Sequence, residues 1–157
     1  MSAALLTLTG LSVLGLAASY VIAMTAGSSA DISLHVLVAV FATMLNLLSH
    51  SLMMFYLLGK GRAVKEAMAE YNLTGNYLTR VAALRGPVFS RGTYAMVLTM
   101  VTAIIGASVD VRVLPKWPHA TLAAVAVLVN VWALWTEGAA LKGTQRVVRE
   151  VDAKVIW

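Results

Sequence analysis

The stretch HVLVAVFATMLNLLSHSLMMFYLLGKGRAVKE, residues 35–66, decides the fold, because residues 119–150 repeat its pattern 84 positions later. Its first half shares four residues with the repeat: His35 and His119, Ala39 and Ala123, Ala42 and Ala126, and Asn46 and Asn130. Its second half shares four more: Gly59 and Gly143, Arg62 and Arg146, Val64 and Val148, and Glu66 and Glu150. Residues spaced three and four positions apart lie on one face of an α-helix, so the pattern predicts two copies of one helix.

The composition is that of a membrane protein. Of the 157 residues, 60% are hydrophobic and 12% are charged, whereas a soluble domain carries roughly 25% charged residues. A soluble chain of this length buries only about 70% of its extended surface, so the apolar excess must face lipid. The absence of cysteine excludes disulfides, iron–sulfur clusters and thiolate metal sites. The net charge of +5 is placed at the expected membrane edges, so we expect no nucleic-acid partner.

Four apolar stretches each provide the roughly 20 residues that cross a bilayer: residues 3–24, 32–58, 88–109 and 118–141. We therefore predict an all-α integral membrane protein whose four transmembrane helices form two tandem pseudo-symmetric helical hairpins. The expected divisions are a first transmembrane hairpin (1–59), a basic cytoplasmic loop (60–91), and a second hairpin with a cytoplasmic C-terminal tail (92–157). The first stretch is too long and lacks the basic start of a signal peptide, so we expect it to be retained.

The basic central segment is predicted to be a loop. Gly59-Lys60-Gly61 is expected to end the second helix, and residues 63–71 and 77–84 are expected to form short surface helices before Pro87 marks the next span. This segment holds six Lys and Arg and the C-terminal tail holds four, against none in the first turn and two in residues 110–117. The positive-inside rule then predicts a multi-pass protein of the bacterial inner-membrane type with both termini in the cytoplasm.

Asn46 and Asn130 lie near the predicted midplane, where polar groups avoid lipid. An Asn46–Asn130 hydrogen bond between helices, worth roughly 0.6–2 kcal/mol, is the simpler interpretation. The alanines on the same faces permit close helix packing without any ligand.

His35 and His119 occupy equivalent positions near the outer face. Two such histidines, followed by alanines that leave room for a porphyrin, could ligate a haem b iron from both sides. Arg112 and Lys116, on the same side, could then hold the propionates. The alternatives are that each histidine only meets water near a helix start, or that the pair joins Asp31 or Asp110 in a simple metal site, whose ligand set would be incomplete.

His50 and Glu137 have no counterparts in the repeat and lie at comparable depth near the cytoplasmic side. They could form a pair that handles protons or contacts a quinone, since ionisable groups within a membrane are usually functional. Alternatively, Glu137 pairs with Lys142 or with a loop arginine. A copper site at His50, Met53 and Met54 is the weaker interpretation, because methionine commonly fills apolar packing.

The leading hypothesis is a haem b binding or quinone-reactive electron-transfer subunit without autonomous catalysis, because no nucleotide-binding or hydrolase motif is present. A second hypothesis is a non-enzymatic membrane scaffold or accessory subunit, and a third is a small transporter or channel. The expected partners are membrane lipids and either further copies of the chain or other membrane subunits.

Overall fold

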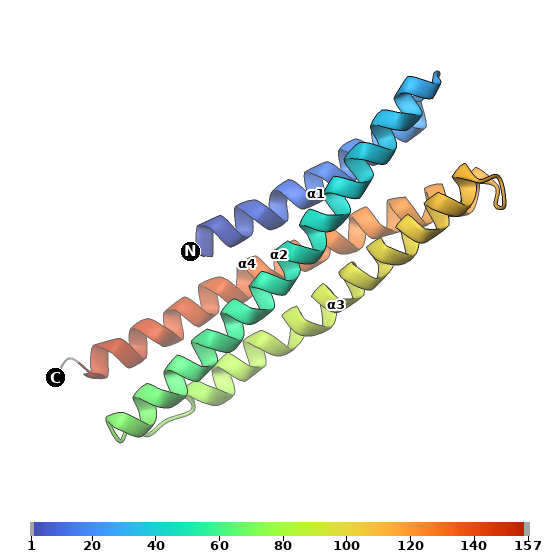
Figure 1. Ribbon diagram of the computed structural model, residues 1–157. Coiled ribbons are helices and arrows are strands. Elements are labelled where there is room, and N and C mark those ends of the chain that lie inside the picture. The colour runs from blue at the N-terminus through green and yellow to red at the C-terminus, as the bar shows by residue number, and fades with distance from the viewer. Residues whose placement is uncertain (1, 156–157) are drawn as a thin grey trace.

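The computed structural model describes residues 2–155, and this part of the chain forms four α-helices joined by short connections (Figure 1). The helices are α1 (Ser2–Thr25), α2 (Ser29–Glu70), α3 (Tyr77–Asp110) and α4 (Lys116–Val155). Each is long and apolar enough to cross a membrane. The prediction of an all-helical chain with four such helices is confirmed, and the fold is compatible with a multi-pass membrane protein.

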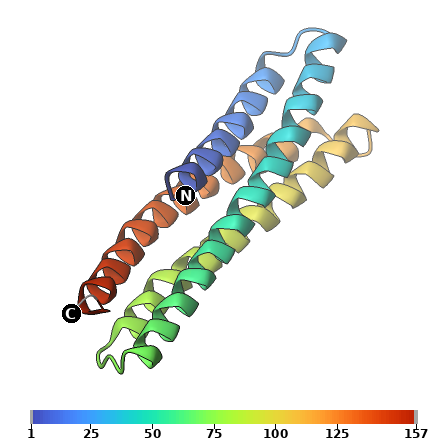
Figure 2. The same ribbon diagram turned by 60° about the vertical axis from the view of Figure 1, so that its left-hand side comes forward.

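The helices form an elongated bundle with two different ends. α1 lies beside α2 and α3 lies beside α4, and α2 also contacts α3 and α4 (Figures 1 and 2). At one end, the α1–α2 and α3–α4 connections diverge from each other. At the other end, α2, α3 and α4 continue past the first residues of α1. The bundle therefore has a four-helix part and a three-helix extension.

The four-helix part buries many polar side chains beside apolar ones and exposes large apolar side chains. Its buried interior contains Thr, Ser, Asn, His and Glu side chains, which are Thr9, Ser12, Ser19, Asn46, Ser49, His50, Thr99, Thr102, Asn130, Thr136 and Glu137. Large apolar side chains instead point outward, among them Phe41 at 68% exposed and Trp135 at 81% exposed. A water-soluble bundle has the opposite distribution, so this one suits a surrounding of lipid.

The predicted central loop and its two short surface helices are wrong. α2 runs without a break through Gly59 and Gly61 to Glu70, and α3 begins at Tyr77 and continues through Pro87. Only residues 71–76 connect the two helices. With 42 residues, α2 is about 63 Å long, roughly twice the hydrocarbon thickness of a bilayer.

Tertiary packing explains why the helices continue. In the three-helix extension, a second buried core joins Val64 of α2, Tyr77 and Val81 of α3, and Val147 and Val151 of α4. Glycine within a helix costs about 1 kcal/mol relative to alanine, and burial of a single large apolar side chain contributes more than that. The local cost of Gly59 and Gly61 predicts a helix end, but this tertiary packing outweighs that cost.

The start of α2 is fixed by a reciprocal cap. Ser28 is the N-cap: its hydroxyl accepts from the Asp31 backbone N–H at 3.2 Å, and the Asp31 carboxylate accepts from the Ser28 backbone N–H at 2.9 Å. The Ser28 hydroxyl and the backbone N–H groups of Gly27 and Ser28 lower the pKa of Asp31. Asp31 therefore serves helix α2 as a capping residue.

Gly15 provides a test of how closely α1 and α2 pack. A Cβ at Gly15 would lie 2.9 Å from the Cβ of Ala42, which cannot move without its backbone, whereas a Cβ at Gly10 would meet nothing within 4 Å. We expect Gly15→Val to destabilise the folded protein by about 1–3 kcal/mol and Gly10→Val to have little effect. Thermal unfolding of the two variants in the same detergent measures the difference. Equal losses would contradict this packing.

The Arg80–Glu150 pair gives the extension a pH dependence. Arg80 donates two hydrogen bonds to the Glu150 carboxylate, one of them at 2.8 Å, and this contact lowers the pKa of Glu150. A lowered carboxyl pKa stabilises the fold above the ordinary carboxyl range, and this stabilisation is lost as the pH falls through the lowered value. We expect the melting temperature of the wild type to exceed that of Glu150→Gln at pH 7, and the difference to shrink as the pH falls below the ordinary carboxyl range. A constant difference across this range would count against the pair.

Candidate functional site

Asn130 is the centre of a buried hydrogen-bond network at mid-height in the bundle. Its Nδ2 group donates to the Thr99 hydroxyl at 3.0 Å and to the Ala126 carbonyl at 2.8 Å. Its Oδ1 atom accepts from Asn46 Nδ2 at 2.5 Å and lies 3.0 Å from His50 Nε2. All the hydrogen-bonding capacity of this side chain is used, and it joins α2, α3 and α4. The Asn46–Asn130 contact expected from the sequence is present.

The same network determines that Nε2 of His50 carries a hydrogen. Because Asn130 Oδ1 can only accept, His50 Nε2 must carry a hydrogen in order to bond to it. His50 Nδ1 then faces Glu137 Oε1 at 2.5 Å. A further proton lies between these two atoms, either on the carboxyl group of a neutral pair or on the imidazole of an ion pair. Both forms have zero net charge, so the pair can be buried with this proton in place.

His50 and Glu137 therefore contact each other, as one interpretation of the sequence expected, and the expected Glu137–Lys142 pairing is not formed within residues 2–155. Both side chains are fully buried. The second oxygen of Glu137, Oε2, has no hydrogen-bond partner in the described chain. This orphaned atom gives the pair a free position for another proton or for a polar ligand.

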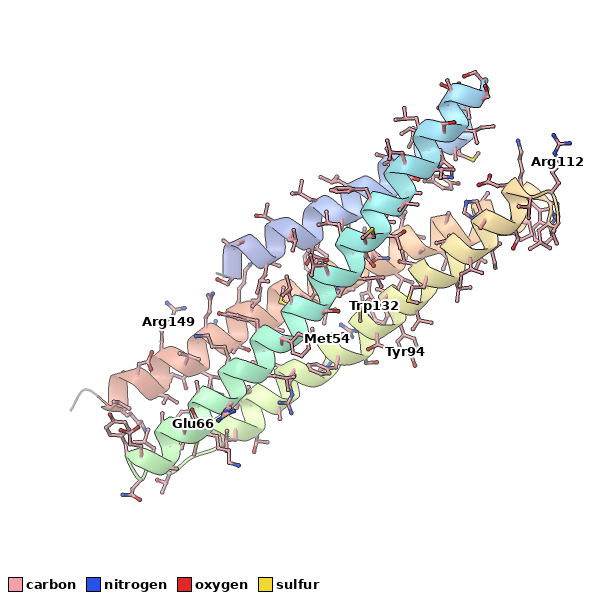
Figure 3. All side chains as sticks on the ribbon, in the orientation of Figure 1. Met54, Glu66, Tyr94, Arg112, Trp132 and Arg149 are labelled. Atoms are coloured by element: carbon pink, nitrogen blue, oxygen red, sulfur yellow. The ribbon has the colours of Figure 1, made fainter. Side chains whose placement is uncertain are left out.

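The backbone of α3 closes one side of the pair at Gly92. A Cβ at Gly92 would lie 3.8 Å from His50 Nδ1, 3.9 Å from Glu137 Oε1 and 2.8 Å from the terminal methyl of Met54. Figure 3 labels Met54 on α2 and Trp132 on α4 in this part of the bundle. Glycine thus allows α3 to approach the pair while Met54 fills the remaining space, and this contact supports Met54 as a packing residue.

Arg91 lies directly beside this site. Its Nη1 group donates to the hydroxyl of Thr136, the residue before Glu137, at 2.6 Å. Its guanidinium lies 4.3 Å from the centre of the Trp132 ring. The Thr136 hydroxyl and the Trp132 ring stabilise the Arg91 cation in an apolar surrounding. Arg91 thus contacts the residue that precedes the buried Glu137 in the chain.

His35 and His119 form a second polar group near the divergent end. Their ring centres are 6.1 Å apart and the ring planes are inclined by 69°. His35 Nδ1 lies 2.9 Å from the Ser19 carbonyl, and His119 Nδ1 lies 3.1 Å from the Thr102 carbonyl. Each carbonyl belongs to the helix that precedes the histidine and can only accept, so both Nδ1 atoms are protonated in these bonds. Each neutral ring then has a free lone pair on Nε2.

The other residues that the sequence assigned to this end, Arg112 and Lys116, are exposed. Arg112 has a left-handed backbone (φ 60°) in the connection between α3 and α4 and extends from the end of the bundle (Figure 3). Lys116 is exposed at the first position of α4. Residues 2–155 contain no cluster of three or more His, Asp or Glu side chains that could hold a metal ion, so the predicted metal alternative with Asp31 or Asp110 is not assembled.

The sequence interpretation overlooked the contributions of α1 and α3. Thr99 and Arg91 of α3 contact Asn130 and Thr136 of α4, while Ser19 of α1 and Thr102 of α3 orient the two outer histidines. A signal was present for two of them, because Ala95, Thr99 and Thr102 follow the same spacings of four and three as the small residues of the repeat. They were overlooked because the two copies match poorly outside α2 and α4.

Comparison with other proteins provides no assignment: no known family, curated protein or solved structure matches the chain. The chemistry of the two polar groups is therefore the basis for inferring function.

The central position of Asn130 can be tested against Asn46. Replacing Asn130 with alanine removes four hydrogen bonds, whereas replacing Asn46 removes one. At about 0.6 kcal/mol for each bond between membrane helices, we expect losses of roughly 2 and 0.6 kcal/mol in the free energy of unfolding. Denaturation in mixed micelles measures both. Losses of the same size in the two variants would show that Asn130 is not the centre.

Proposed function

We propose that this chain is a multi-pass protein of the bacterial inner membrane that binds haem b between His35 and His119 and transfers electrons as a subunit of a larger membrane assembly. In this proposal, two pseudo-symmetric hairpins, α1–α2 and α3–α4, are related by an axis along the membrane normal. The His50–Glu137 pair lies toward the cytoplasm and exchanges a proton or contacts a quinone.

The observation that carries the proposal is the geometry of the two outer histidines. An imidazole nitrogen bonds a metal at about 2 Å, so two histidines that would hold one iron must lie within several ångströms of each other. The observed separation is 6.1 Å. Metal-ligating histidines usually donate their other N–H to a carbonyl or carboxylate, which fixes the ring, and both Nδ1 atoms do this here.

The surroundings of the histidines are suited to a flat apolar ligand. Ala39 and Ala123, about one turn further along α2 and α4, are small, and like the histidines they are partly exposed. Ala42 and Ala126, nearly another turn along, are fully buried. The facing sides of α2 and α4 are thus partly exposed at the histidine level and closed below it, and Gly106 of α3 leaves room for the His119 ring. Arg112 and Lys116 are the cations available to the propionates on this side.

The repeat supports the symmetric arrangement. Asn46 contacts Asn130 at a sequence separation of 84, and His35 is adjacent to His119 at the same separation. Equivalent residues of two copies meet each other only near an axis that relates the copies. Because both pairs lie between α2 and α4, the axis would pass between these helices. The concentration of Lys and Arg around the three-helix extension supports a cytoplasmic location for that end and for both termini.

Haem b would supply reversible one-electron chemistry, and the chain itself provides the proton site. His50 Nε2 is fixed by Asn130, so a proton added or removed at this site must be exchanged at the Nδ1–Oε1 contact or at Glu137 Oε2. A quinone headgroup that reached Glu137 Oε2 could form a hydrogen bond with this atom. The exposed apolar exterior leaves extensive surface for further copies or for other membrane subunits.

A second candidate function, a non-enzymatic scaffold, is favoured by one observation, the hydrogen bond between Asn46 and Asn130. In that case the Asn130 network and the His35–His119 group only hold the helices together. Absorption by bound haem distinguishes the two candidates.

Protein purified from haem-replete cells is expected to show a Soret band that His35→Ala and His119→Ala each abolish. His50→Gln should retain the band, because His50 lies outside the proposed ligand pair. His35→Met should retain haem with a shifted spectrum, since a thioether can also ligate the iron. Absorption spectra and pyridine haemochrome content measure these outcomes. A colourless wild type that takes up no added haemin would exclude the proposal and leave the scaffold.

A further inference from the structure

A third polar region lies between α2 and α4 in the three-helix extension, away from both histidine sites. A cavity of about 270 Å³ is lined there by Tyr56 and Lys60 of α2 and by Thr144, Gln145, Val148 and Arg149 of α4. Gln145 Nε2 donates to the Ser2 hydroxyl at 2.5 Å, so the cavity lies beside the first turn of α1. Since α2 and α4 continue past that turn, α1 leaves this part of their groove uncovered (Figures 1 and 2).

The lining of the cavity is suited to an anion. Lys60 and Arg149 provide two cations, and neither forms an ion pair within the described part of the chain. Thr144 is 1% exposed and its hydroxyl has no hydrogen-bond partner among residues 2–155. A buried hydroxyl without a partner is uncommon, because the unmet hydrogen bond costs roughly 1–3 kcal/mol. An anionic oxygen in the cavity would accept from this hydroxyl and from both cations.

The depth of the cavity favours a lipid. The apolar stretch of α2 ends at Leu58 and that of α4 ends at Leu141, two and three residues before Lys60 and Thr144. The cavity is therefore at the level of phospholipid headgroups. On the membrane side, Leu5, Leu6 and Tyr56 pack partly exposed against the buried core, which provides an apolar surface for an acyl chain.

We propose that this cavity binds the phosphate of an anionic phospholipid, with Lys60 and Arg149 as its charge partners and the Thr144 hydroxyl as a hydrogen-bond donor. Lys60 Nζ lies 5.7 Å from the centre of the Tyr56 ring, so the ring orients the cation at the cavity wall. The site is independent of haem binding, because the cavity lies toward the opposite end of the bundle from His35 and His119 and the buried core around Met53 and Leu57 lies between them. Either proposal can fail without the other.

The test uses native mass spectrometry of the full chain in a neutral detergent, with phosphatidylglycerol or phosphatidylcholine added at equal concentrations. We expect the wild type to retain phosphatidylglycerol preferentially. The Lys60→Gln/Arg149→Gln double variant should lose at least about fivefold of that preference, since one basic residue at an anionic surface contributes about that factor. Thr144→Val keeps the side-chain shape and should weaken retention less.

A matched control removes the same charge from exposed positions at the same end. Lys65→Gln/Arg146→Gln deletes two cations that do not line the cavity and should leave the preference unchanged. Equal losses in the two double variants would overturn the site in favour of general charge attraction. Displacement of the lipid by 10 mM inorganic phosphate would identify a free-anion site instead. Failure of the wild type to prefer phosphatidylglycerol, or co-purification of an acidic protein that only the cavity variant loses, would also overturn the lipid proposal.

Discussion

The hydrogen bonds of Asn130 are the interaction on which the rest of the structure depends. In an apolar surrounding, an amide side chain has no water to replace a missing partner, so it fixes any helix that provides one. Asn130 obtains partners from Asn46 and His50 on α2, from Thr99 on α3 and from its own helix at Ala126. A shift of any of these helices by one residue would break a bond. The network therefore sets the register of three helices. Apolar contacts alone would leave that register loosely defined.

The need of buried polar groups for hydrogen-bond partners also accounts for the two kinds of packing along the bundle. Within the apolar spans there is little hydrophobic force between helices, so small residues such as Gly15 and Ala42 allow close approach and polar bonds give specificity. In the extension, an ordinary apolar core of Val64, Val81 and Val147 holds the same three helices. The α2 helix is continuous because apolar burial in the extension offsets the cost of its two glycines.

Much of this arrangement could be predicted from the sequence. The apolar stretches gave four helices, and the repeat indicated that Asn46 would meet Asn130. The His50–Glu137 contact was one of two interpretations of their matching depths, and the alternative was a pairing of Glu137 with Lys142 or with a loop arginine. The helix through Gly59 and Gly61 was missed, because local glycine costs were weighed without the packing in the extension that offsets them.

The partners on α1 and α3 could not be derived for a different reason. A threonine in an apolar helix usually bonds to its own backbone, as Thr102 does at 2.7 Å, so its identity alone does not predict a contact with another helix. Which carbonyl a histidine meets depends on helix crossing geometry. Cavities such as that beside Thr144 depend on where α1 begins relative to α2 and α4, and sequence spacing does not encode that offset.

The separation of the three polar regions limits how they can influence one another. From His35 to Asn46 along α2 is eleven residues, or about 16 Å, and the fully buried Ala42 and Ala126 lie between these levels. On the other side, the core of Met53, Leu57 and Leu141 separates the His50–Glu137 pair from the cavity at Thr144. A proton therefore has no polar side-chain path from that cavity to Glu137 through this core. On α3 and α4, the Arg91 guanidinium contacts the Thr136 hydroxyl and the Trp132 ring, and these contacts belong to the wall of the bundle at the level of the residue before Glu137.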